Sequence, residues 1–377
     1  MRVLIAPDDF KGTLSAVEAA EAIAVGWRSV SPDDVLTLIP MSDGGPGFVS
    51  AISTVLGGDI APVGLRGPLG DTAIGMVLMV GDTGYVESAH GCGLALVHPD
   101  RRDACAATTY GVGQLIGAAL DSGARRIVIG LGGTASTDGG AGMLAALGAR
   151  AYDGEGREVP LDAGGAALAR VSSVDLVPAR ERVGDVELVA ASDVDSPLLG
   201  ARGAARGFAA QKGADDAEVE ELEAALTAYS RVIGRQADGK DPSVALGAGA
   251  GGGLGYGLLL LGGTRVPGIE TVMRLVGLEA AIATSDLVVT GEGCFDWQSL
   301  RGKVVSGIAE AALGQARPVV VIAGRVEVGK REYVAMGVTE AYQVGDDGSV
   351  PETRTQAAHR LAERAARVAS QWSRRGA

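Results

Sequence analysis

The sequence predicts an α/β protein with a doubly wound parallel sheet and a second, mixed α/β domain inserted into the first. Three observations predict this. The first 40 residues alternate strand, helix and strand, the last 100 or so repeat that alternation, and the segment between them contains short strands joined by turns. A chain of 377 residues is expected to form two domains of about 150 to 200 residues. We place the first domain at residues 1–62 plus 285–377 and the inserted domain at 63–284.

The first domain opens with a strand–helix–strand unit. Residues 3–7 (VLIAP) form a short apolar run that ends at a proline, and residues 34–41 (DVLTLIPM) form a second one. Between them, Ser15 and Glu18 make a capping box at the start of a helix whose apolar residues recur on one face. This order favours parallel pairing of the two strands through a right-handed crossover.

The end of the chain repeats the pattern, and the middle differs from it. DLVVTGEG and PVVVIAG are predicted strands on either side of a helix at KVVSGIAEAAL, and an amphipathic helix follows from about residue 352 to 372. Residues from about 60 to 110 are predicted to form an antiparallel meander. Two further strands are expected at RRIVIGLGG and VELVAASDVD.

Composition and charge exclude several classes of protein. A net charge of −13 disfavours nucleic-acid binding, and an apolar share of 47% is too high for a disordered chain. No apolar run reaches the roughly 18 residues that a membrane-spanning helix needs, and the start lacks the features of a signal peptide. Three widely spaced cysteines predict neither a disulfide framework nor a zinc site. We expect a cytoplasmic protein.

Five segments place glycines beside carboxylates or lysines where a predicted strand ends. In doubly wound sheets, ligands bind outside the carboxyl ends of the strands. The segments are PDDFKG with Asp8 and Lys11, SDGGPG with Asp43, GLGGTASTDGG with Gly132, Gly133, Thr134, Ser136, Asp138 and Gly139, ASDVD with Asp193 and Asp195, and TGEGCFDWQSLRGK with Glu292, Asp296, Gln298 and Lys303. Asp193 and Asp195 would face one side if their strand continued that far.

These residue types suit phosphoryl transfer. Carboxylates can hold Mg²⁺, backbone amides can bind phosphates, and lysines can offset negative charge in the transition state. The sequence has no GxxxxGK[ST] loop, no protein-kinase motif set and no GxGxxG after the first strand. It therefore supports neither a P-loop kinase nor an NAD dehydrogenase. The run GAGAGGGLGYG, with Gly251 and Gly252, is either a nucleotide loop or a site of tight strand-to-helix packing.

Taken in order, the motifs resemble the bacterial glycerate kinase family, a two-domain family unrelated to the P-loop enzymes. The resemblance is carried by PDDFKG, SDGGPG, GLGGTASTDGGAGM, ASDVDSPLLG, QKGAD, GAGAGGGLGYG and SDLVVTGEG, and it runs to the C-terminal helix. It implies a Rossmann-like domain and a second α/β domain around an active-site cleft. It also implies an ATP- and Mg²⁺-dependent kinase that converts D-glycerate to phosphoglycerate, with the 2-phosphate favoured over the 3-phosphate.

The resemblance also implies roles for the matching residues. Asp193 or Asp195 would be the base near the hydroxyl group or a Mg²⁺ ligand, and Asp8, Lys11 and Asp43 would be further catalytic residues. Residues expected to bind substrate or phosphate are Lys212, Glu292, Asp296, Gln298 and Lys303. Residues expected to bind the nucleotide are Gly132, Gly133, Thr134, Ser136, Asp138, Gly139, Gly251 and Gly252. The expected partners are glycerate and ATP, with neither nucleic acid nor membrane, and a homodimer is left open.

Five residues depart from the family pattern, two of them, Thr137 and Ser196, in place of asparagine. Asp9 stands where members read PDSFK, Pro46 where they read DGGEG, and Cys294 where they read GEGR. An extra acid and a lost arginine both disfavour a bound carboxylate. Two alternatives therefore stay open. One is a kinase of the same fold for another small hydroxy acid, and the other is a ligand-binding or regulatory protein whose catalysis has decayed.

Overall fold

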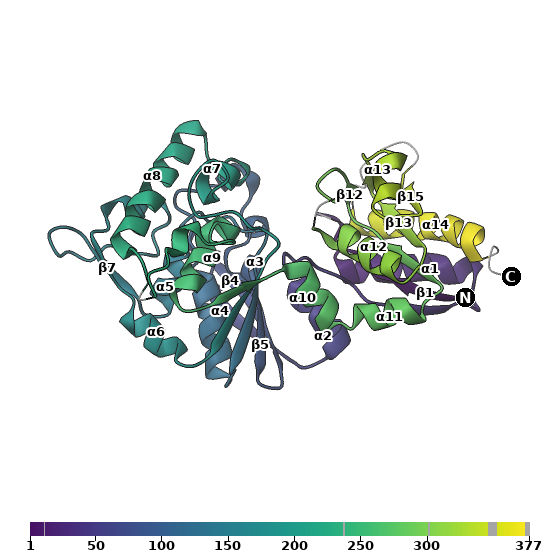
Figure 1. Cartoon of the computed structure of the whole chain (residues 1–377), viewed down its shortest axis with the longest axis horizontal. Coiled ribbons are helices and arrows are strands. Elements are labelled where there is room, and N and C mark those ends of the chain that lie inside the picture. Colours follow the sequence, from purple (N-terminus) through teal and green to yellow (C-terminus); the bar gives the residue numbers. More distant parts are fainter. Residues whose placement is uncertain (11, 237, 301, 346–352, 374–377) are drawn as a thin grey trace. The chain divides into compact units, whose positions relative to one another are not determined.

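The structure is a computed structural model that describes residues 1–10, 12–236, 238–300, 302–345 and 353–373 (Figure 1). The chain forms two compact units. Unit 1 comprises Met1–Asp43, Ser50–Gly57 and Ile269–Ala377, and unit 2 comprises Gly44–Val49 and Gly58–Gly268. Unit 2 is therefore inserted into the sequence of unit 1, and α2 (Phe48–Leu56) begins in unit 2 and continues in unit 1.

Unit 1 is built on a fully parallel five-stranded sheet of order β15-β13-β11-β1-β2. Short apolar runs that alternate with helices favour this arrangement, because each helix returns the chain to the same edge of the sheet. The strands are β1 (Arg2–Ile5), β2 (Val35–Leu38), β11 (Leu287–Thr290), β13 (Val319–Ala323) and β15 (Glu340–Gln343). A separate pair joins β12 (Cys294–Phe295) to β14 (Arg325–Val326).

Helices cover both faces of this sheet. α1 (Ala16–Val30) and α14 (Arg354–Trp372) pack side by side and share an apolar core with alternate residues of β1, β11 and β13 (Figure 1). α11 (Leu278–Thr284) and α12 (Val304–Gly314) contact strands of the same sheet. The other helices of this part of the chain are α10 (Gly268–Leu275) and α13 (Lys330–Ala335). α1 begins with the predicted capping box, because Ser15 and Glu18 exchange side-chain and backbone hydrogen bonds.

Unit 2 contains a mixed six-stranded sheet of order β10-β9-β6-β5-β4-β3. β3 (Asp59–Arg66), β4 (Thr72–Val80) and β5 (Thr83–Glu87) form the predicted antiparallel meander. β5, β6 (Arg126–Gly130), β9 (Glu187–Ala191) and β10 (Thr264–Val266) run parallel. β7 (Arg150–Tyr152) pairs with β8 (Ser173–Asp175) as a separate ribbon. The α/β class, with a doubly wound parallel sheet and a second mixed α/β domain, is confirmed.

The helices of unit 2 pack around one large apolar core with β4, β5, β6 and β9. They are α3 (Ser88–Cys92), α4 (Tyr110–Asp121), α5 (Ala141–Ala146), α6 (Val177–Val183), α7 (Ala204–Phe208), α8 (Asp216–Ile233) and α9 (Ala250–Leu260). Short 3₁₀ turns occur at Leu94–Leu96, Pro99–Arg101, Ala166–Arg170, Ala210–Lys212 and Pro242–Val244.

Candidate functional site

An acidic cluster lies where three neighbouring parallel strands of unit 1 end. Asp8 follows β1, Asp43 follows β2 and Glu292 follows β11, and these strands are adjacent in the sheet. The cluster therefore has the position that the motifs predicted. Asp9 belongs to it as well, and its N–H donates to Oδ1 of Asp8 at 2.8 Å.

Asp8 is the member of the acidic cluster whose proton affinity is most changed. Burial raises its pKa well above the usual value, and the charges of Asp43, Asp9 and Glu292 raise it further. The hydrogen bond from the Asp9 N–H acts in the opposite direction but is outweighed. Asp8 therefore keeps its proton to a higher pH than an exposed aspartate does.

The last predicted motif of unit 1 forms a turn and a helix start. Oδ1 of Asp296 accepts the N–H of Gln298 at 2.7 Å, so this carboxylate fixes the turn, while the Gln298 side chain is exposed. Lys303 precedes the first residue of α12, and its backbone N–H donates to Oγ of Ser306 at 2.9 Å. Lys11, predicted to be catalytic, lies outside the described residues.

In unit 2, the predicted glycine loop runs from the end of β6 to α5 and is organised by Asp138. The Asp138 side chain is 0% exposed, and burial raises its pKa. Its carboxylate accepts hydrogen bonds from the N–H and hydroxyl of Thr109 and from the N–H groups of Gly140 and Gly142. Asp138 thus joins the start of α4 to the start of α5. These contacts give it a structural role in addition to its predicted one.

Lys212 brings a buried positive charge to this loop. Its side chain is 4% exposed, and its Nζ donates to the carbonyl oxygen of Ser136 and, at 3.2 Å, to the hydroxyl of Thr134. Burial lowers the pKa of Lys212 to about 8, although Cys92 and Asp138 act to raise it. Three predicted residues, Lys212, Thr134 and Ser136, are therefore in direct contact.

The second glycine run packs against the same loop. Gly251, Gly252 and Gly253 have positive φ angles of 61°, 70° and 90°, a left-handed conformation that side chains rarely adopt. The N–H of Gly139 donates to the carbonyl of Gly252 at 3.0 Å, and a Cβ on Gly252 would collide with the Ser136 carbonyl. These glycines therefore allow two backbone segments and Lys212 to approach closely.

The strand that precedes Asp193 and Asp195 does not continue as far as these residues, so the condition for both to face one side is not met. β9 ends at Ala191, so the alternation of a strand no longer applies at these positions. Oδ1 of Asp193 accepts the N–H of Gly268, the first residue of α10, at 3.0 Å, whereas the Asp195 side chain is exposed.

Sequence reasoning missed Glu87, the last residue of β5. Its side chain is 4% exposed, and its carboxylate accepts hydrogen bonds from the N–H groups of Gly47 and Val49. A single acid in the segment TGYVESAHG carries no glycine pattern and was not selected. The available signal was an acidic residue at the last position of a strand whose two faces are both buried.

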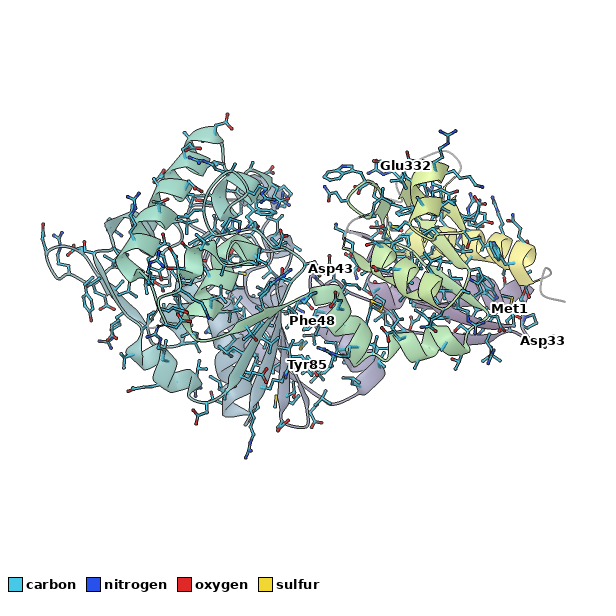
Figure 2. The ribbon with its side chains drawn as sticks, in the orientation of Figure 1. Met1, Asp33, Asp43, Phe48, Tyr85 and Glu332 are labelled. Carbon is cyan, nitrogen blue, oxygen red and sulfur yellow. The ribbon has the colours of Figure 1, made fainter. Side chains whose placement is uncertain are left out.

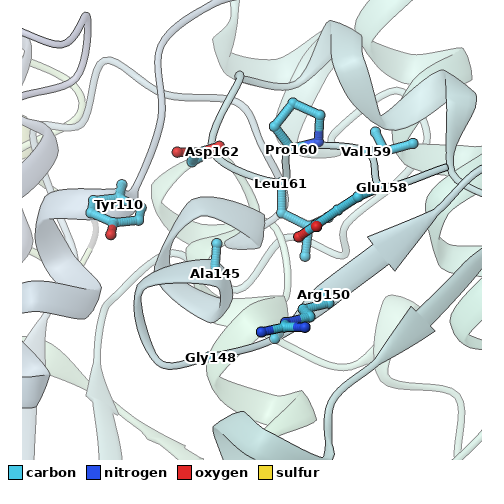
Figure 3. A pocket seen from close by; sticks show the side chains of 10 residues that line it. Tyr110, Ala145, Gly148, Arg150, Glu158, Val159, Pro160, Leu161 and Asp162 are labelled. Carbon is cyan, nitrogen blue, oxygen red and sulfur yellow. The ribbon is translucent and has the colours of Figure 1, made fainter.

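Unit 2 also contains a cavity of about 550 Å³ (Figure 3). It is lined by Tyr110, Ala145, Gly148, Ala149, Arg150, Glu158, Val159, Pro160, Leu161 and Asp162. None of the predicted site residues lines it. Within the described ranges, no three or more His, Cys, Asp or Glu side chains are placed to hold a metal ion.

Comparison with known proteins points to one family along nearly the whole chain. A sequence model of the Glycerate kinase family matches residues 3–373. The chain belongs to the glycerate kinase family. A Glycerate kinase of Bacillus subtilis (strain 168) is 40% identical over 371 residues, covering 97% of this chain and 96% of that protein. A Glycerate 2-kinase of Escherichia coli (strain K12) is 41% identical over 327 residues, covering 86% of this chain and 85% of that protein.

A solved structure supports the fold of this glycerate kinase family member. A crystal structure of a protein assigned as glycerate kinase 2 of Salmonella typhimurium LT2 matches with a TM-score of 0.82 and 36% identity, covering 100% of this chain and 99% of that chain. The resemblance drawn from the motifs is confirmed. The chain is a phosphotransferase with an alcohol acceptor, and membership in a kinase family implies the use of ATP. In the described residues, no helix is long and apolar enough to cross a membrane.

Proposed function

We propose that this protein transfers the terminal phosphoryl group of ATP to the 2-hydroxyl group of D-glycerate and forms 2-phosphoglycerate. The observation that carries the proposal is the match to a Glycerate 2-kinase over 86% of the chain at 41% identity. The family model matches residues 3–373, which contain the glycine loops and the strand-end carboxylates, so family membership supports the chemistry as well as the fold.

Lys212 and the glycine loop of unit 2 are proposed to bind phosphate. The buried ammonium group gives this loop the positive charge that a phosphate requires, and loop N–H groups can donate to phosphate oxygens. We propose that residues 132–139, with Gly251 and Gly252, bind the nucleotide. Lys303, Glu292, Asp296 and Gln298 are proposed to bind the acceptor or its phosphate.

Mg²⁺ is proposed to enter with the nucleotide. This ion typically keeps several waters and takes one or two protein carboxylates together with substrate phosphates. Among the residues that the structure describes, no three or more His, Cys, Asp or Glu side chains are placed to hold a metal ion. We propose Asp193 and Asp195 as the carboxylates that contact it, and Mg²⁺ would offset the charge on the phosphates when bound.

An acceptor assay with product analysis tests this function. ATP consumption with Mg²⁺ is measured for D-glycerate, L-glycerate, glycolate and D-lactate, and the product is read by phosphorus NMR. We expect turnover with D-glycerate and a phosphorus signal split into a doublet by the single proton on carbon 2. A triplet would show the 3-phosphate and contradict the proposed position.

A kinase for a different small hydroxy acid is the second candidate, and Asp9 favours it. Its charge raises the pKa of Asp8, so it adds negative charge to a cluster where a carboxylate substrate would be repelled. At Cys294, Arg325 lies opposite in the β12–β14 register, but its guanidinium pairs with Glu327 at 3.1 Å. Turnover with glycolate or D-lactate but not D-glycerate would support this candidate. No turnover with any acceptor would support a decayed enzyme.

A further inference from the structure

The chain first enters unit 2 at Gly44–Val49, which we call the crossing segment. The segment follows Asp43 directly, and its last two residues begin α2 (Figure 2). Only six residues long, it cannot form a core of its own, so its position depends on the parts of unit 2 that hold it. Its first residue, Gly44, is bonded to Asp43, so contacts that hold the segment also restrict the position of Asp43.

Glu87 holds the crossing segment through both oxygens of its carboxylate. Oε1 accepts the N–H of Gly47 at 3.1 Å, and Oε2 accepts the N–H of Val49 at 3.3 Å. These donors lie at the start of α2, where unpaired N–H groups and the helix dipole favour a negative charge. Nε2 of His90 lies 3.8 Å from Oε1, and its Nδ1 accepts the N–H of Met76 at 3.4 Å, which leaves the ring proton on the nitrogen that faces Glu87.

The crossing segment also packs closely on glycines of β6 and of the loop after it. A Cβ on Gly130 would lie 2.5 Å from the carbonyl oxygen of Gly44 and 2.8 Å from the ring of Phe48. A Cβ on Gly132 would lie 2.5 Å from Cα of Gly45. These distances are too short for any side chain, so Gly130 and Gly132 are needed for this packing.

An aromatic contact holds the segment on the same side of β5 as Glu87. The rings of Phe48 and Tyr85 lie with centroids 6.3 Å apart at 54° (Figure 2). Tyr85 and Glu87 are two residues apart on β5 and so share a face of the strand. The carboxylate, the aromatic pair and the glycines therefore act on one segment from one surface of unit 2.

We propose that Glu87 is a positioning residue of the phosphotransferase: its carboxylate clamps the crossing segment and thereby fixes Asp43. The effect on turnover rests on the proposed function, whereas the clamp itself does not. The second passage between units is held in a similar way, because Asp193 accepts the N–H of Gly268, the last residue of unit 2. The carboxylate is required because two N–H groups need two acceptors. A glutamine offers one acceptor and would leave a donor facing an N–H.

Hydrogen–deuterium exchange tests the clamp without any substrate. In Glu87→Gln, we expect the peptide that covers residues 44–49 to exchange at least about tenfold faster than in the wild type, while peptides from β9 and α8 keep their rates. Glu187→Gln is the matched control, because Glu187 is an exposed glutamate on the same sheet that pairs with Arg126 at 3.0 Å. It should leave exchange at 44–49 unchanged. Equal exchange in Glu87→Gln and the wild type would overturn the proposal, whatever the activity.

Steady-state kinetics then test the positioning role. With rates divided by the folded fraction from circular dichroism, we expect kcat of Glu87→Gln to fall about tenfold to a hundredfold, and KM for ATP to change less than threefold. A purely structural role would lower only the folded fraction, so wild-type kcat per folded molecule would also overturn the proposal. If the wild type did not phosphorylate glycerate, the proposed function would fail, and the exchange experiment would still decide the clamp.

Discussion

In unit 1, carboxylates follow the ends of three neighbouring parallel strands. In unit 2, a glycine loop that contacts the buried Lys212 follows the end of a central parallel strand. Both regions lie at the carboxyl ends of parallel strands, the usual ligand position in such sheets. Burial displaces their proton affinities in opposite directions: it raises the pKa of Asp8 and lowers the pKa of Lys212 to about 8.

The common cause is that burial disfavours the charged form of any group. The two regions differ in how far their neighbours offset that cost. Lys212 donates to two oxygens and lies near Asp138, which helps its positive charge to persist. Asp8 has carboxylates as neighbours, and these oppose its negative charge. Unit 2 therefore contains a buried cation that we propose to bind phosphate, and unit 1 contains an aspartate that keeps its proton to higher pH than an exposed aspartate does.

The largest expected effect comes from removing the cation of unit 2. Lys212→Met should reduce kcat/KM by about 10² to 10³-fold, because the buried charge that we propose to stabilise phosphate is lost. Rates are divided by the folded fraction from circular dichroism, because the substitution leaves the buried carbonyl oxygen of Ser136 without its Lys212 donor. Lys240→Met is the control, because Lys240 is exposed and pairs with the nearby Asp238. Turnover by Lys212→Met within a factor of two of the wild type would show that this charge plays no part.

The pH profile adds an independent test of Lys212. Because its pKa is about 8, kcat/KM should decrease above about pH 8 as the ammonium group loses its proton. In Lys212→Arg, any activity that remains should lack this decrease, because a guanidinium stays charged. An alkaline decrease that is the same in both proteins must come from another group.

The next effect concerns stability. Asp138→Asn should lower the free energy of unfolding of unit 2 by about 2–3 kcal/mol, because an amide cannot accept all the N–H and hydroxyl donors that surround this buried carboxylate. Circular dichroism in urea measures the change. Asp153→Asn is the matched control, because Asp153 also accepts two backbone N–H groups, from Glu155 and Arg157, but lies at the surface. Its substitution should lower the free energy of unfolding by less than about 1 kcal/mol. Equal losses in the two variants would contradict a special role for the buried carboxylate.

The sequence predicted the strand–helix alternation, the capping box at Ser15 and the carboxylates at strand ends, because these depend on local patterns. It did not show that β9 ends at Ala191, since the length of that strand is set by its neighbours in the sheet. It also could not show which glycines serve close packing. Gly132 was predicted to bind a nucleotide, and only the fold reveals that Gly45 lies against it. Glu87 was missed for the same reason, because its partners are 38 to 40 residues away.

The smallest expected effect tests the acidic cluster of unit 1 through the pH dependence of its stability. The pKa of Asp8 is higher in the folded protein than its ordinary value of 3.8, so the folded state binds the proton more tightly than the unfolded chain does. The stabilising contribution of this proton is complete below about pH 3.8 and is lost as pH rises toward the folded-state pKa. Within that window, Asp8 adds a negative slope of up to about 1.4 kcal/mol per pH unit to the free energy of unfolding.

Asp8→Asn should remove this slope, and tryptophan fluorescence in urea can measure it between pH 4 and pH 8. All three tryptophans, Trp27, Trp297 and Trp372, belong to unit 1, so the signal reports unfolding of that unit alone. Asp33→Asn provides the control, because Asp33 is exposed and lies outside the cluster. If Asp8→Asn and Asp33→Asn both keep the wild-type slope, the proton is not held at Asp8. The contrast between a proton-retaining unit 1 and a cationic unit 2 would then depend on Lys212 alone.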